Sequence, residues 1–204
     1  MLVDDHAVVR AGYRRLLEQQ PGIQVVAEAD GGDRAYVLFV EHQPDVVVLD
    51  LSMPGVSGLD TIRRIISREA DARILVFSMH DDAMLAERAV QLGARVYITK
   101  SNAPEVLATA VEAVVAGQLY LSSDIANSIA ILKLSGDENP VQLLSAREFE
   151  IFRLIVAGRS VTAIARLLSL STKTVANYHT LIKRKLGTPS DVELVLLARR
   201  HNML

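Results

Sequence analysis

The chain of 204 residues contains no cysteine, so disulfides, thiolate metal sites and cysteine nucleophiles are excluded. No apolar run approaches the roughly 18 residues that a membrane-spanning helix needs, so we expect no membrane partner. Asp4 and Asp5 lie where a secretory signal peptide would carry positive charge. These absences favour a cytoplasmic protein, and a composition that is 50% hydrophobic and 23% charged is ordinary for a globular fold.

The small net charge of −2 combines an acidic front with a basic tail. Residues 1–120 carry 11 Lys or Arg and 17 Asp or Glu, a net charge of −6. Residues 145–204 carry 10 and 4, a net charge of +6. This division predicts that only the C-terminal part binds a polyanion, and chance unevenness is the simpler alternative.

The first 117 residues alternate short apolar runs with longer segments of helical periodicity. The runs predicted as strands are Leu2–Val3, Ile23–Ala27, Val46–Leu49, Ile74–Phe77 and Val96–Thr99. The predicted helices are Ala7–Gln20, Asp33–His42, Gly58–Glu69, Ala83–Leu92 and Pro104–Ala116. Helices that alternate with continuous apolar strands indicate a parallel sheet covered on both faces. We therefore expect an α/β domain over residues 1–117, a flavodoxin-like doubly wound sheet of five strands.

After Gly117 the alternation stops. Residues 118–143 are predicted to form a linker that contains a helix, Ser122–Leu134, and the turn-rich stretch Ser135–Pro140. Residues 144–204 have no strand-like run and are predicted as an all-α domain of four short helices. The helix-boundary signals are a capping box of Ser145 and Glu148, N-caps at Ser160 and Ser171, ends at Gly158 and Gly187, and Pro189 in a first turn.

Asp50 stands between the apolar run Val46–Leu49 and the turn signal Pro54-Gly55, so it is either a turn residue or a reactive group. In parallel sheets, functional groups gather at the carboxyl ends of the strands. The side chains expected there are Asp4, Asp5, Asp50, Ser78 and Lys100. Carboxylates that converge in one crevice repel each other, and Mg²⁺ would relieve that repulsion. A metal, a lysine and a carboxylate nucleophile together are typical of phosphoryl transfer.

Four segments in this order resemble the receiver domain of two-component response regulators: Asp4-Asp5-His6, VVVLDLSMPGVSGLD (46–60), VFSMHDD (76–82) and GARVYITKSN (93–102). The resemblance implies that Asp50 accepts a phosphoryl group from a sensor histidine kinase. It implies that Mg²⁺ is bound by Asp5, by Asp50, by the backbone carbonyl of Ser52 and, through water, by Asp4. Lys100 would pair with the phosphoryl oxygens, Ser78 would move to hydrogen-bond them, and Tyr97 would change rotamer with Ser78.

Each residue also has a structural alternative. Asp4 could be a helix N-cap, Ser78 an ordinary strand-end hydroxyl, Tyr97 a packing residue and Lys100 a solvated lysine. The chain has only Met1–Val3 before the acidic pair, fewer residues than the family usually has, and this bears on stability more than on chemistry. Ser52 and His80 occupy positions that flank the phosphoryl group in the family and tune its lifetime.

The segment Leu144–Leu186 has the spacing of a helix-turn-helix, with two helices that meet near Leu168–Ser171. It resembles the LuxR-type output domain of the NarL/FixJ class of response regulators. The residues that carry this resemblance are Leu144-Ser145, Arg147-Glu148, Gly158, Ile164-Ala165, Leu168, Leu170-Ser171, Lys173-Thr174-Val175 and Lys185-Leu186. The resemblance implies that double-stranded DNA is the ligand.

By that resemblance, the base-facing positions are Ala176, Asn177 and Thr180. Asn177 is the strongest candidate, because Asn can make two hydrogen bonds to adenine. Thr174 lies in the first turns of the same helix, and phosphate contacts are expected from Lys173, Tyr178, His179 and Lys183. The alternative for the lysines from 183 to 185 is a solvated helix end, favoured by the helix macrodipole.

The last predicted helix, Val192–His201, has an apolar stripe wider than one buried face needs. In the family this helix dimerises the output domain, so Val192, Val195 and Leu196 are expected at a dimer contact. A homodimer of the active form would present two recognition helices to the half-sites of an inverted repeat. The alternative is a helix that is buried within one monomer.

The sequence as a whole predicts a phosphorylation-controlled transcriptional regulator and not a turnover enzyme. A flavodoxin-like enzyme or phosphatase is the first competitor, but the chain has no Gly-rich phosphate loop. The second competitor is a constitutive DNA-binding protein whose receiver no longer signals. The intact set of strand-end residues argues against it.

Overall fold

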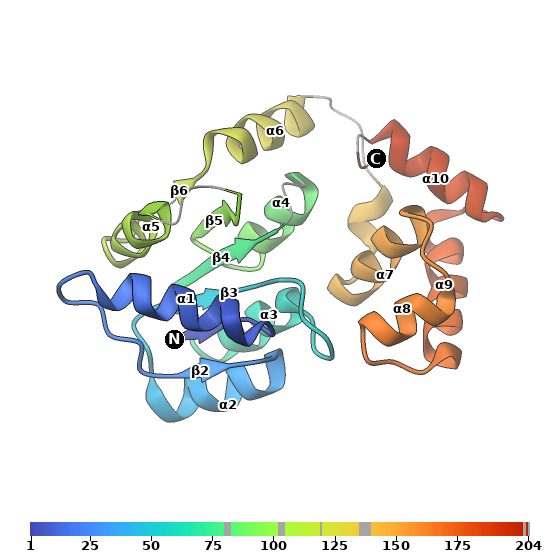
Figure 1. Cartoon of the computed structure of the whole chain (residues 1–204). Coiled ribbons are helices and arrows are strands. Elements are labelled where there is room, and N and C mark those ends of the chain that lie inside the picture. The colour runs from blue at the N-terminus through green and yellow to red at the C-terminus, as the bar shows by residue number, and fades with distance from the viewer. Residues whose placement is uncertain (80–82, 102–104, 119, 135–139, 202, 204) are drawn as a thin grey trace. The chain divides into compact units, whose positions relative to one another are not determined.

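The computed structural model of the chain describes residues 1–79, 83–101, 105–118, 120–134, 140–201 and 203. They form two compact units, Met1–Ile131 and Leu132–Leu204 (Figure 1). No helix in these described ranges is long and apolar enough to cross a membrane.

The N-terminal unit is built on a parallel sheet with the strand order β2-β1-β3-β4-β5-β6. Its strands are β1 (Leu2–Val3), β2 (Glu28–Ala29), β3 (Val47–Leu49), β4 (Ile74–Ser78), β5 (Val96–Thr99) and β6 (Tyr120–Leu121). The order reverses direction at β1, which confirms the predicted doubly wound α/β fold.

Two details of the predicted sheet are wrong. Five strands were expected and six are present, because Tyr120–Leu121 adds β6 to the free edge of β5. The strand expected at Ile23–Ala27 lies further along the chain, at Glu28–Ala29. β1 offers only Leu2 and Val3 for pairing, so the ladder is confined to the two residues that stand opposite them.

Helices cover both faces of this sheet: α1 (Ala7–Glu18), α2 (Gly32–His42), α3 (Gly58–Arg68), α4 (Ala83–Gln91) and α5 (Glu105–Val115), followed by α6 (Ser123–Leu134). Their bounds agree with the predicted helices to within two residues, apart from Pro104, which lies outside the described residues. Leu17 of α1 and Leu107 and Val111 of α5 share one core with Val48 and Leu75 of the sheet. The helices α2, α3 and α4 contact one another in sequence and cover the other face (Figure 1).

Close packing fixes the loop that follows β3. A Cβ atom on Gly58 would lie 2.5 Å from the Cα of Leu51, so only glycine allows α3 to begin this close to the strand end. The Ser57 hydroxyl accepts a hydrogen bond from the backbone N–H of Asp60 and caps α3. The tip of β3, where Asp50 lies, is therefore held against the start of α3.

The C-terminal unit contains a short 3₁₀ helix η1 (Pro140–Leu143) and the helices α7 (Ala146–Val156), α8 (Val161–Leu167), α9 (Thr172–Leu186) and α10 (Asp191–Arg200). The described helices confirm the predicted all-α domain. They enclose a core of fully buried side chains: Phe149, Phe152, Ile164, Val175, Ile182 and Leu194. The preceding linker stretch, residues 135–139, lies outside the described residues.

Most of the predicted helix boundaries in this unit are confirmed. The Ser145 and Glu148 capping box is formed, Ser160 and Ser171 cap α8 and α9, and Gly187 ends α9 with a left-handed φ of 65°. The prediction that Pro189 opens the last helix is wrong. Ser190 is the N-cap, its hydroxyl accepting from the backbone N–H of Glu193, so Pro189 precedes the cap.

Candidate functional site

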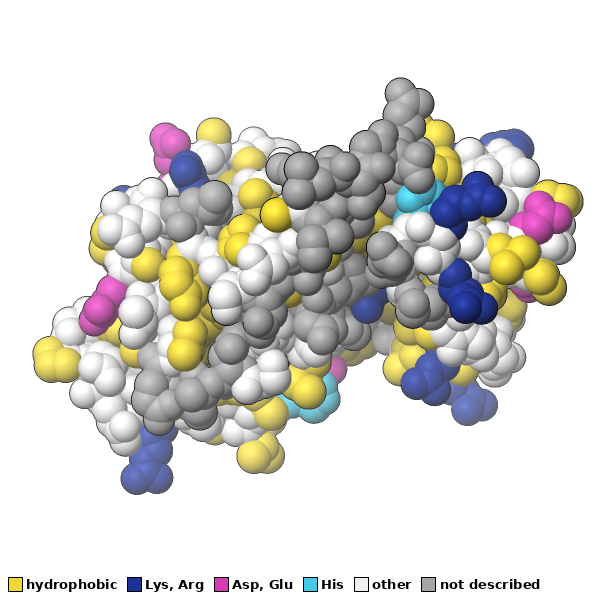
Figure 2. All heavy atoms as spheres, turned by 90° about the horizontal axis from the view of Figure 1, so that it is seen from above, with side chains coloured by type: hydrophobic (Ala, Val, Ile, Leu, Met, Phe, Trp, Pro, Cys, Tyr) yellow, Lys and Arg dark blue, Asp and Glu magenta, His cyan; other side chains and the backbone are white. Residues whose placement is uncertain are grey.

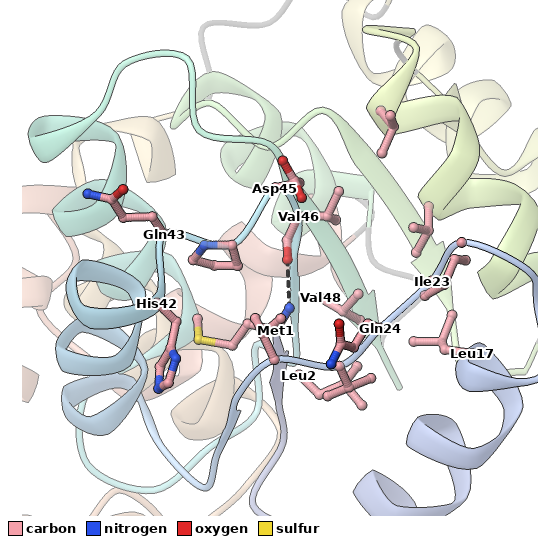
Figure 3. Close-up of a pocket in the computed structure, with 16 residues that line it drawn as sticks. Met1, Leu2, Leu17, Ile23, Gln24, His42, Gln43, Asp45, Val46 and Val48 are labelled. Carbon is pink, nitrogen blue, oxygen red and sulfur yellow. Dashed lines mark hydrogen bonds between the residues drawn. The ribbon is translucent and has the colours of Figure 1, made fainter.

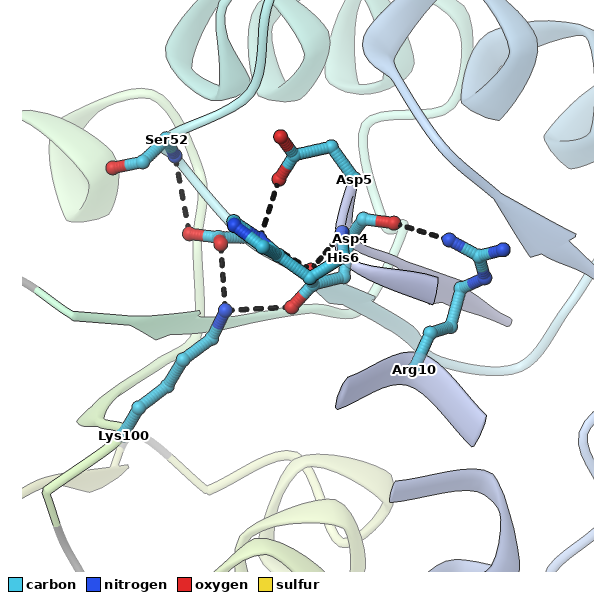
Figure 4. Close-up of polar contacts among 7 residues, drawn as sticks. Asp4, Asp5, His6, Arg10, Ser52 and Lys100 are labelled. Atoms are coloured by element: carbon cyan, nitrogen blue, oxygen red, sulfur yellow. Dashed lines mark hydrogen bonds and ion pairs between the residues drawn. The ribbon is translucent and has the colours of Figure 1, made fainter. Parts of the chain in front are cut away.

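The carboxyl ends of β1, β3 and β5 meet in an acidic pocket formed by Asp4, Asp5, Asp50 and Lys100 (Figure 4). The Lys100 ammonium donates to Asp4 Oδ2 and to Asp50 Oδ2, at 2.6 Å in both cases. The exposed fractions of these side chains are 6% for Lys100, 8% for Asp4 and 2% for Asp50. The alternative that Lys100 is a solvated surface lysine is therefore wrong.

Two opposing effects act on the pKa of Lys100. Burial lowers it, because a charged group loses hydration, whereas the charges and hydrogen bonds of Asp50 and Asp4 raise it. The carboxylates prevail, and the net pKa lies above the ordinary value. Lys100 is therefore a permanent cation at neutral pH, and it balances part of the negative charge of the pocket.

Asp50 is held from two sides. Its Oδ1 accepts a hydrogen bond from the backbone N–H of Ser52 at 3.1 Å, and its Oδ2 accepts from Lys100. The first contact is the kind of local bond that a turn-forming aspartate makes. Asp50 therefore fits both interpretations, the turn residue and the reactive group. Its carboxylate shapes the turn after β3 and also points into the buried pocket.

Asp4 and Asp5 differ in their surroundings. Asp4 Oδ1 accepts from the backbone N–H of His6 at 2.8 Å, and α1 begins at Ala7 with His6, not Asp4, in the N-cap position. Asp5 is partly exposed, but its Oδ1 is shielded from solvent and accepts no hydrogen bond of good geometry within the described part of the chain. A shielded carboxylate oxygen without a donor is an observation that fits a bound cation.

Ser78 is the last residue of β4, whereas Tyr97 lies within β5, and both are fully buried. Ser78 is paired in register with Thr99, and its carbonyl accepts from the Lys100 N–H at 2.7 Å. Tyr97 is the register partner of Val76. The structure therefore brings Ser78 next to the backbone of Lys100 and encloses the Tyr97 ring, while His80 lies outside the described residues.

The helix-turn-helix of the C-terminal unit is formed by α8 and α9. Ser169 has a left-handed φ of 53° in the turn, and the Leu170 N–H donates to the Ala165 carbonyl at 2.8 Å. Of the predicted DNA-contacting residues on α9, Lys173, Ala176, Asn177 and Thr180 are exposed, and Thr174, Tyr178, His179 and Lys183 are half-buried. Figure 2 shows Lys and Arg side chains at the surface of this unit, on the side that the view draws.

Two of the residues expected at phosphates contact a carboxylate. His179 Nε2 lies 2.7 Å and Lys183 Nζ 3.3 Å from Asp191 Oδ1, at the start of α10. Burial raises the pKa of Asp191, but the hydrogen bonds and charges of His179 and Lys183 bring it below its ordinary value. Lys185 is also paired, with the buried Glu148 at 2.7 Å, so this lysine ties α9 to α7.

The face of α10 expected at a dimer contact is largely exposed. Val192 and Leu196 are 69% and 57% exposed, and Val195 is half-buried. Leu194 and Ala198, on the other side of the helix, are fully buried in the unit. The alternative of a helix buried wholly within one monomer is therefore wrong for α10, as the described residues show it.

The matches to known protein families fall on two separate parts of the chain. The family model of the response regulator receiver domain matches residues 1–112, and the model of the bacterial regulatory proteins of the luxR family matches residues 142–198. The chain belongs to the two-component response regulators. It carries a LuxR-type DNA-binding output domain, and it is not a turnover enzyme.

Curated relatives and solved structures agree with this assignment. The chain is 40% identical to the response regulator UvrY of Escherichia coli K12 and 38% identical to GacA of Pseudomonas aeruginosa PAO1, over all of this chain and 94% and 96% of theirs. A LuxR-family response regulator from Aurantimonas sp. SI85-9A1 has a TM-score of 0.64 at 48% identity, over 66% of this chain and 96% of that one. RcsB of Salmonella enterica, bound to promoter DNA with the phosphomimetic BeF₃⁻, has a TM-score of 0.66 at 27% identity, over 96% and 95%.

The receiver also has a cavity of about 260 Å³ near the amino ends of β1 and β3, the end of the sheet opposite the acidic pocket (Figure 3). It lies between Met1, Leu17, Val25, His42 and Val46, and none of the predicted site residues lines it. The Met1 amino group donates to the Val46 carbonyl at 2.8 Å, and burial lowers its pKa to about 6 although the charge of Asp45 opposes this.

Sequence reasoning assigned no role to two residues that contact the acidic pocket. Arg10 donates to the Asp4 carbonyl at 2.6 Å and pairs with Glu28 at 3.0 Å. The His6 ring lies 2.9 Å from Asp5 Oδ1. Arg10 follows His6 by one helical turn, a spacing that could have indicated that both face the strand ends.

Proposed function

We propose that Asp50 is the phosphoacceptor of this response regulator and that phosphorylation controls DNA binding by α9. One observation carries the proposal: Asp50 is a buried carboxylate that points into a pocket shared with Asp4, Asp5 and Lys100. A sensor histidine kinase would be the donor, as the receiver family implies. Since DNA is the proposed target, we infer that the protein acts in the cytoplasm.

In the proposed reaction, an Asp50 carboxylate oxygen attacks the phosphorus of the kinase phosphohistidine. A P–O bond forms as the P–N bond breaks, and the imidazole leaves with the electron pair of that bond. Lys100, already 2.6 Å from Asp50, would follow the charge onto the phosphoryl oxygens. The Ser78 hydroxyl would then hydrogen-bond the phosphoryl group, and Tyr97 would move with it.

The donor set of the pocket supports Mg²⁺ as the cofactor. Asp5 and Asp50 would be direct ligands, with the Ser52 carbonyl as the third and Asp4 acting through water. Mg²⁺ prefers oxygen ligands of this kind, and one ligand atom from each pocket carboxylate lies within 4.8 Å of the others. When bound, Mg²⁺ would supply charge neutralisation at the phosphoryl oxygens.

For the output domain we propose that α9 enters the major groove. Its exposed residues support this proposal, with Asn177 and Thr180 and the small Ala176 at base-facing positions. Lys173, Thr174 and Tyr178 would contact the sugar-phosphate backbone of the DNA. His179 and Lys183 would do so only in exchange for their contacts with Asp191.

We further propose a homodimer of the active form through Val192, Val195 and Leu196. The support is the exposure of Val192 and Leu196 on a helix whose other side is buried. RcsB has been solved as two dimers bound to two DNAs, at a TM-score of 0.63 to this chain. Two copies related by a twofold axis would place their α9 helices at inverted-repeat half-sites.

The test compares the wild type with Asp50→Asn and with Asp71→Asn, which changes an exposed aspartate. Each protein is incubated with acetyl phosphate and Mg²⁺ and examined by intact mass for the gain of one phosphoryl group. Anisotropy titrations then measure affinity for duplexes that the phosphorylated wild type selects from a randomised library.

The wild type and Asp71→Asn should gain the phosphoryl group and bind DNA more tightly with the donor than without it. Asp50→Asn should do neither. Equal phosphorylation of all three proteins would refute the assignment of Asp50. Equal DNA affinity with and without the donor would support a constitutive DNA-binding protein instead.

A further inference from the structure

His6 lies at the mouth of the acidic pocket with one ring nitrogen turned toward two carboxylates. Its Nδ1 is 2.9 Å from Asp5 Oδ1 and 3.3 Å from Asp4 Oδ1 (Figure 4). The side chain is 66% exposed, so the mouth is open on this side. The roles proposed above for the pocket use oxygen atoms and an ammonium group, and they leave this nitrogen without a function.

The two distances from His6 Nδ1 are close to the spacing of neighbouring ligands around one metal ion. Two neighbouring ligands of an octahedral ion, each about 2.1 Å from the metal, lie about 3.0 Å apart, and opposite ligands lie about 4.2 Å apart. One ligand atom from each of Asp4, Asp5, His6 and Asp50 falls within 4.8 Å of all the others, so the most distant of them would have to approach by about 0.6 Å to share one ion. The His6 nitrogen can therefore join the same ion as Asp5 with little movement of either side chain.

The second observation is the unsatisfied oxygen of Asp5. Asp5 Oδ1 is shielded from solvent and accepts no hydrogen bond of good geometry in the described structure, although His6 Nδ1 is close to it. A donor nitrogen at 2.9 Å normally supplies the hydrogen bond that such an oxygen lacks. Asp5 Oδ1 therefore keeps an acceptor position that a cation at the pocket mouth would fill.

The chemistry of the added ligand then decides which ions are favoured. Mg²⁺ is a hard ion that takes carboxylate, carbonyl and water oxygens. An imidazole nitrogen instead suits late first-row ions, whose affinity rises from Mn²⁺ to Ni²⁺ and Cu²⁺. A pocket with three carboxylates serves Mg²⁺, and the same pocket with His6 added favours Ni²⁺, Co²⁺ or Zn²⁺ more strongly.

We propose that His6 Nδ1 is a further metal ligand of the acidic pocket, which binds a divalent transition-metal ion through His6, Asp5 and Asp50 in competition with Mg²⁺. The proposal rests on the Mg²⁺ site proposed above and adds a nitrogen ligand to it. A transition-metal ion in the pocket would take the position proposed for Mg²⁺, so the two kinds of ion would exclude each other from the receiver.

The test is calorimetric titration of the full chain with Ni²⁺ and, separately, with Mg²⁺. The variants are His6→Gln, His42→Gln as a matched control on an exposed histidine at the other end of the sheet, and Asp50→Asn. His6→Gln should weaken Ni²⁺ binding at least about ten-fold and Mg²⁺ binding less than about three-fold. His42→Gln should change neither affinity, and Asp50→Asn should weaken both.

A second readout detects the ligand directly. The visible absorption of bound Co²⁺ should shift in His6→Gln and in His6→Asn, because an oxygen or water replaces the nitrogen, and it should stay unchanged in His42→Gln. If His6→Gln leaves Ni²⁺ affinity and the Co²⁺ spectrum unchanged, His6 is only a hydrogen-bonding neighbour of Asp5 and the inference is wrong.

The two proposals can fail separately. Mg²⁺ binding that depends on Asp50, with no effect of His6→Gln on Ni²⁺, overturns the inference and keeps the proposed cofactor. Ni²⁺ binding that depends on both residues, with no heat from Mg²⁺, keeps the inference and overturns Mg²⁺ as the cofactor.

Discussion

Replacement of Lys100 by methionine tests the charge balance of the acidic pocket. Asp4 Oδ2 and Asp50 Oδ2 each lie 2.6 Å from Lys100 Nζ, so these oxygens are at most about 5 Å apart. At an effective dielectric constant of about 20, two unit charges at that distance repel each other by about 3 kcal/mol. Methionine has a similar length and no charge. Lys100→Met removes the attraction of the ammonium to both carboxylates and leaves their repulsion uncompensated, so it should lower the free energy of unfolding of the receiver by about 3 kcal/mol in the absence of divalent ions.

The assay is thermal and urea unfolding of the full chain, followed by amide exchange in peptides of β3 and β5. For a unit the size of Met1–Ile131, this loss corresponds to a fall in Tm of about 10 °C. Lys173→Met is the matched control, since Lys173 is exposed and lies in the other unit. Millimolar Mg²⁺ should restore most of the lost stability, because a cation again separates the carboxylates.

A double-mutant cycle measures the interaction between Lys100 and Asp50 directly. In the Asp50→Asn background Lys100→Met removes the attraction to one carboxylate instead of two, so it should cost at least about 1 kcal/mol less than in the wild type. An unfolding free energy of Lys100→Met within about 1 kcal/mol of the wild type, or a cost that is equal in both backgrounds, would refute the reasoning. Either result would mean that the two carboxylates do not form a dry, mutually repelling pair.

Three further predictions concern contacts outside this pair. Lys185→Met removes a hydrogen bond to the buried Glu148 and should destabilise the C-terminal unit by about 1.5 kcal/mol, seen as faster amide exchange in α7 and α9, while Lys173→Met leaves exchange unchanged. The lowered pKa of Asp191 means that its pairing stabilises the unit above the ordinary aspartate pKa and is lost as the pH falls through the folded value. Amide exchange in α9 and α10 should thus lose part of its acid sensitivity in Asp191→Asn. Arg10→Met should weaken Mg²⁺ binding about ten-fold in calorimetry, because Arg10 fixes the Asp4 carbonyl. Arg14→Met removes the other Glu28 partner and the Arg14–Glu18 pair but no contact with Asp4, so it should leave Mg²⁺ binding unchanged.

The acidic pocket was predictable from the sequence because the direction of parallel strands determines which residues meet at their carboxyl ends. Once runs such as Val46–Leu49 are recognised as parallel strands, the residues after them must meet at one edge of the sheet. Asp4, Asp50 and Lys100 were placed together by that rule, and the structure confirms their contact. The capping signals at Ser145 and Ser171 were equally local, so they too were predictable.

Features set by a neighbouring element could not be predicted in this way. The position of β2 depends on how much of β1 is available for pairing, and a run such as Ile23–Ala27 carries no information about that length. The contacts of His179 and Lys183 with Asp191 depend on how α10 packs against α9. A helix sequence shows which residues share a face, but not which neighbour will cover it.

Charge counting explains why the proposed phosphorylation should act as a switch. Asp4, Asp5, Asp50 and Lys100 together carry a formal charge of −2, which one divalent cation would balance. A phosphoryl group on Asp50 replaces one negative charge by about −1.5 to −2 and adds strong acceptor oxygens. The balanced pocket then has an excess of about 0.5 to 1 negative charge in a buried setting, where new hydrogen-bond donors are strongly favoured. Ser78 is a hydroxyl at the same sheet edge, and it is as fully enclosed as Tyr97, so its movement toward the phosphoryl group would require the surrounding packing to change.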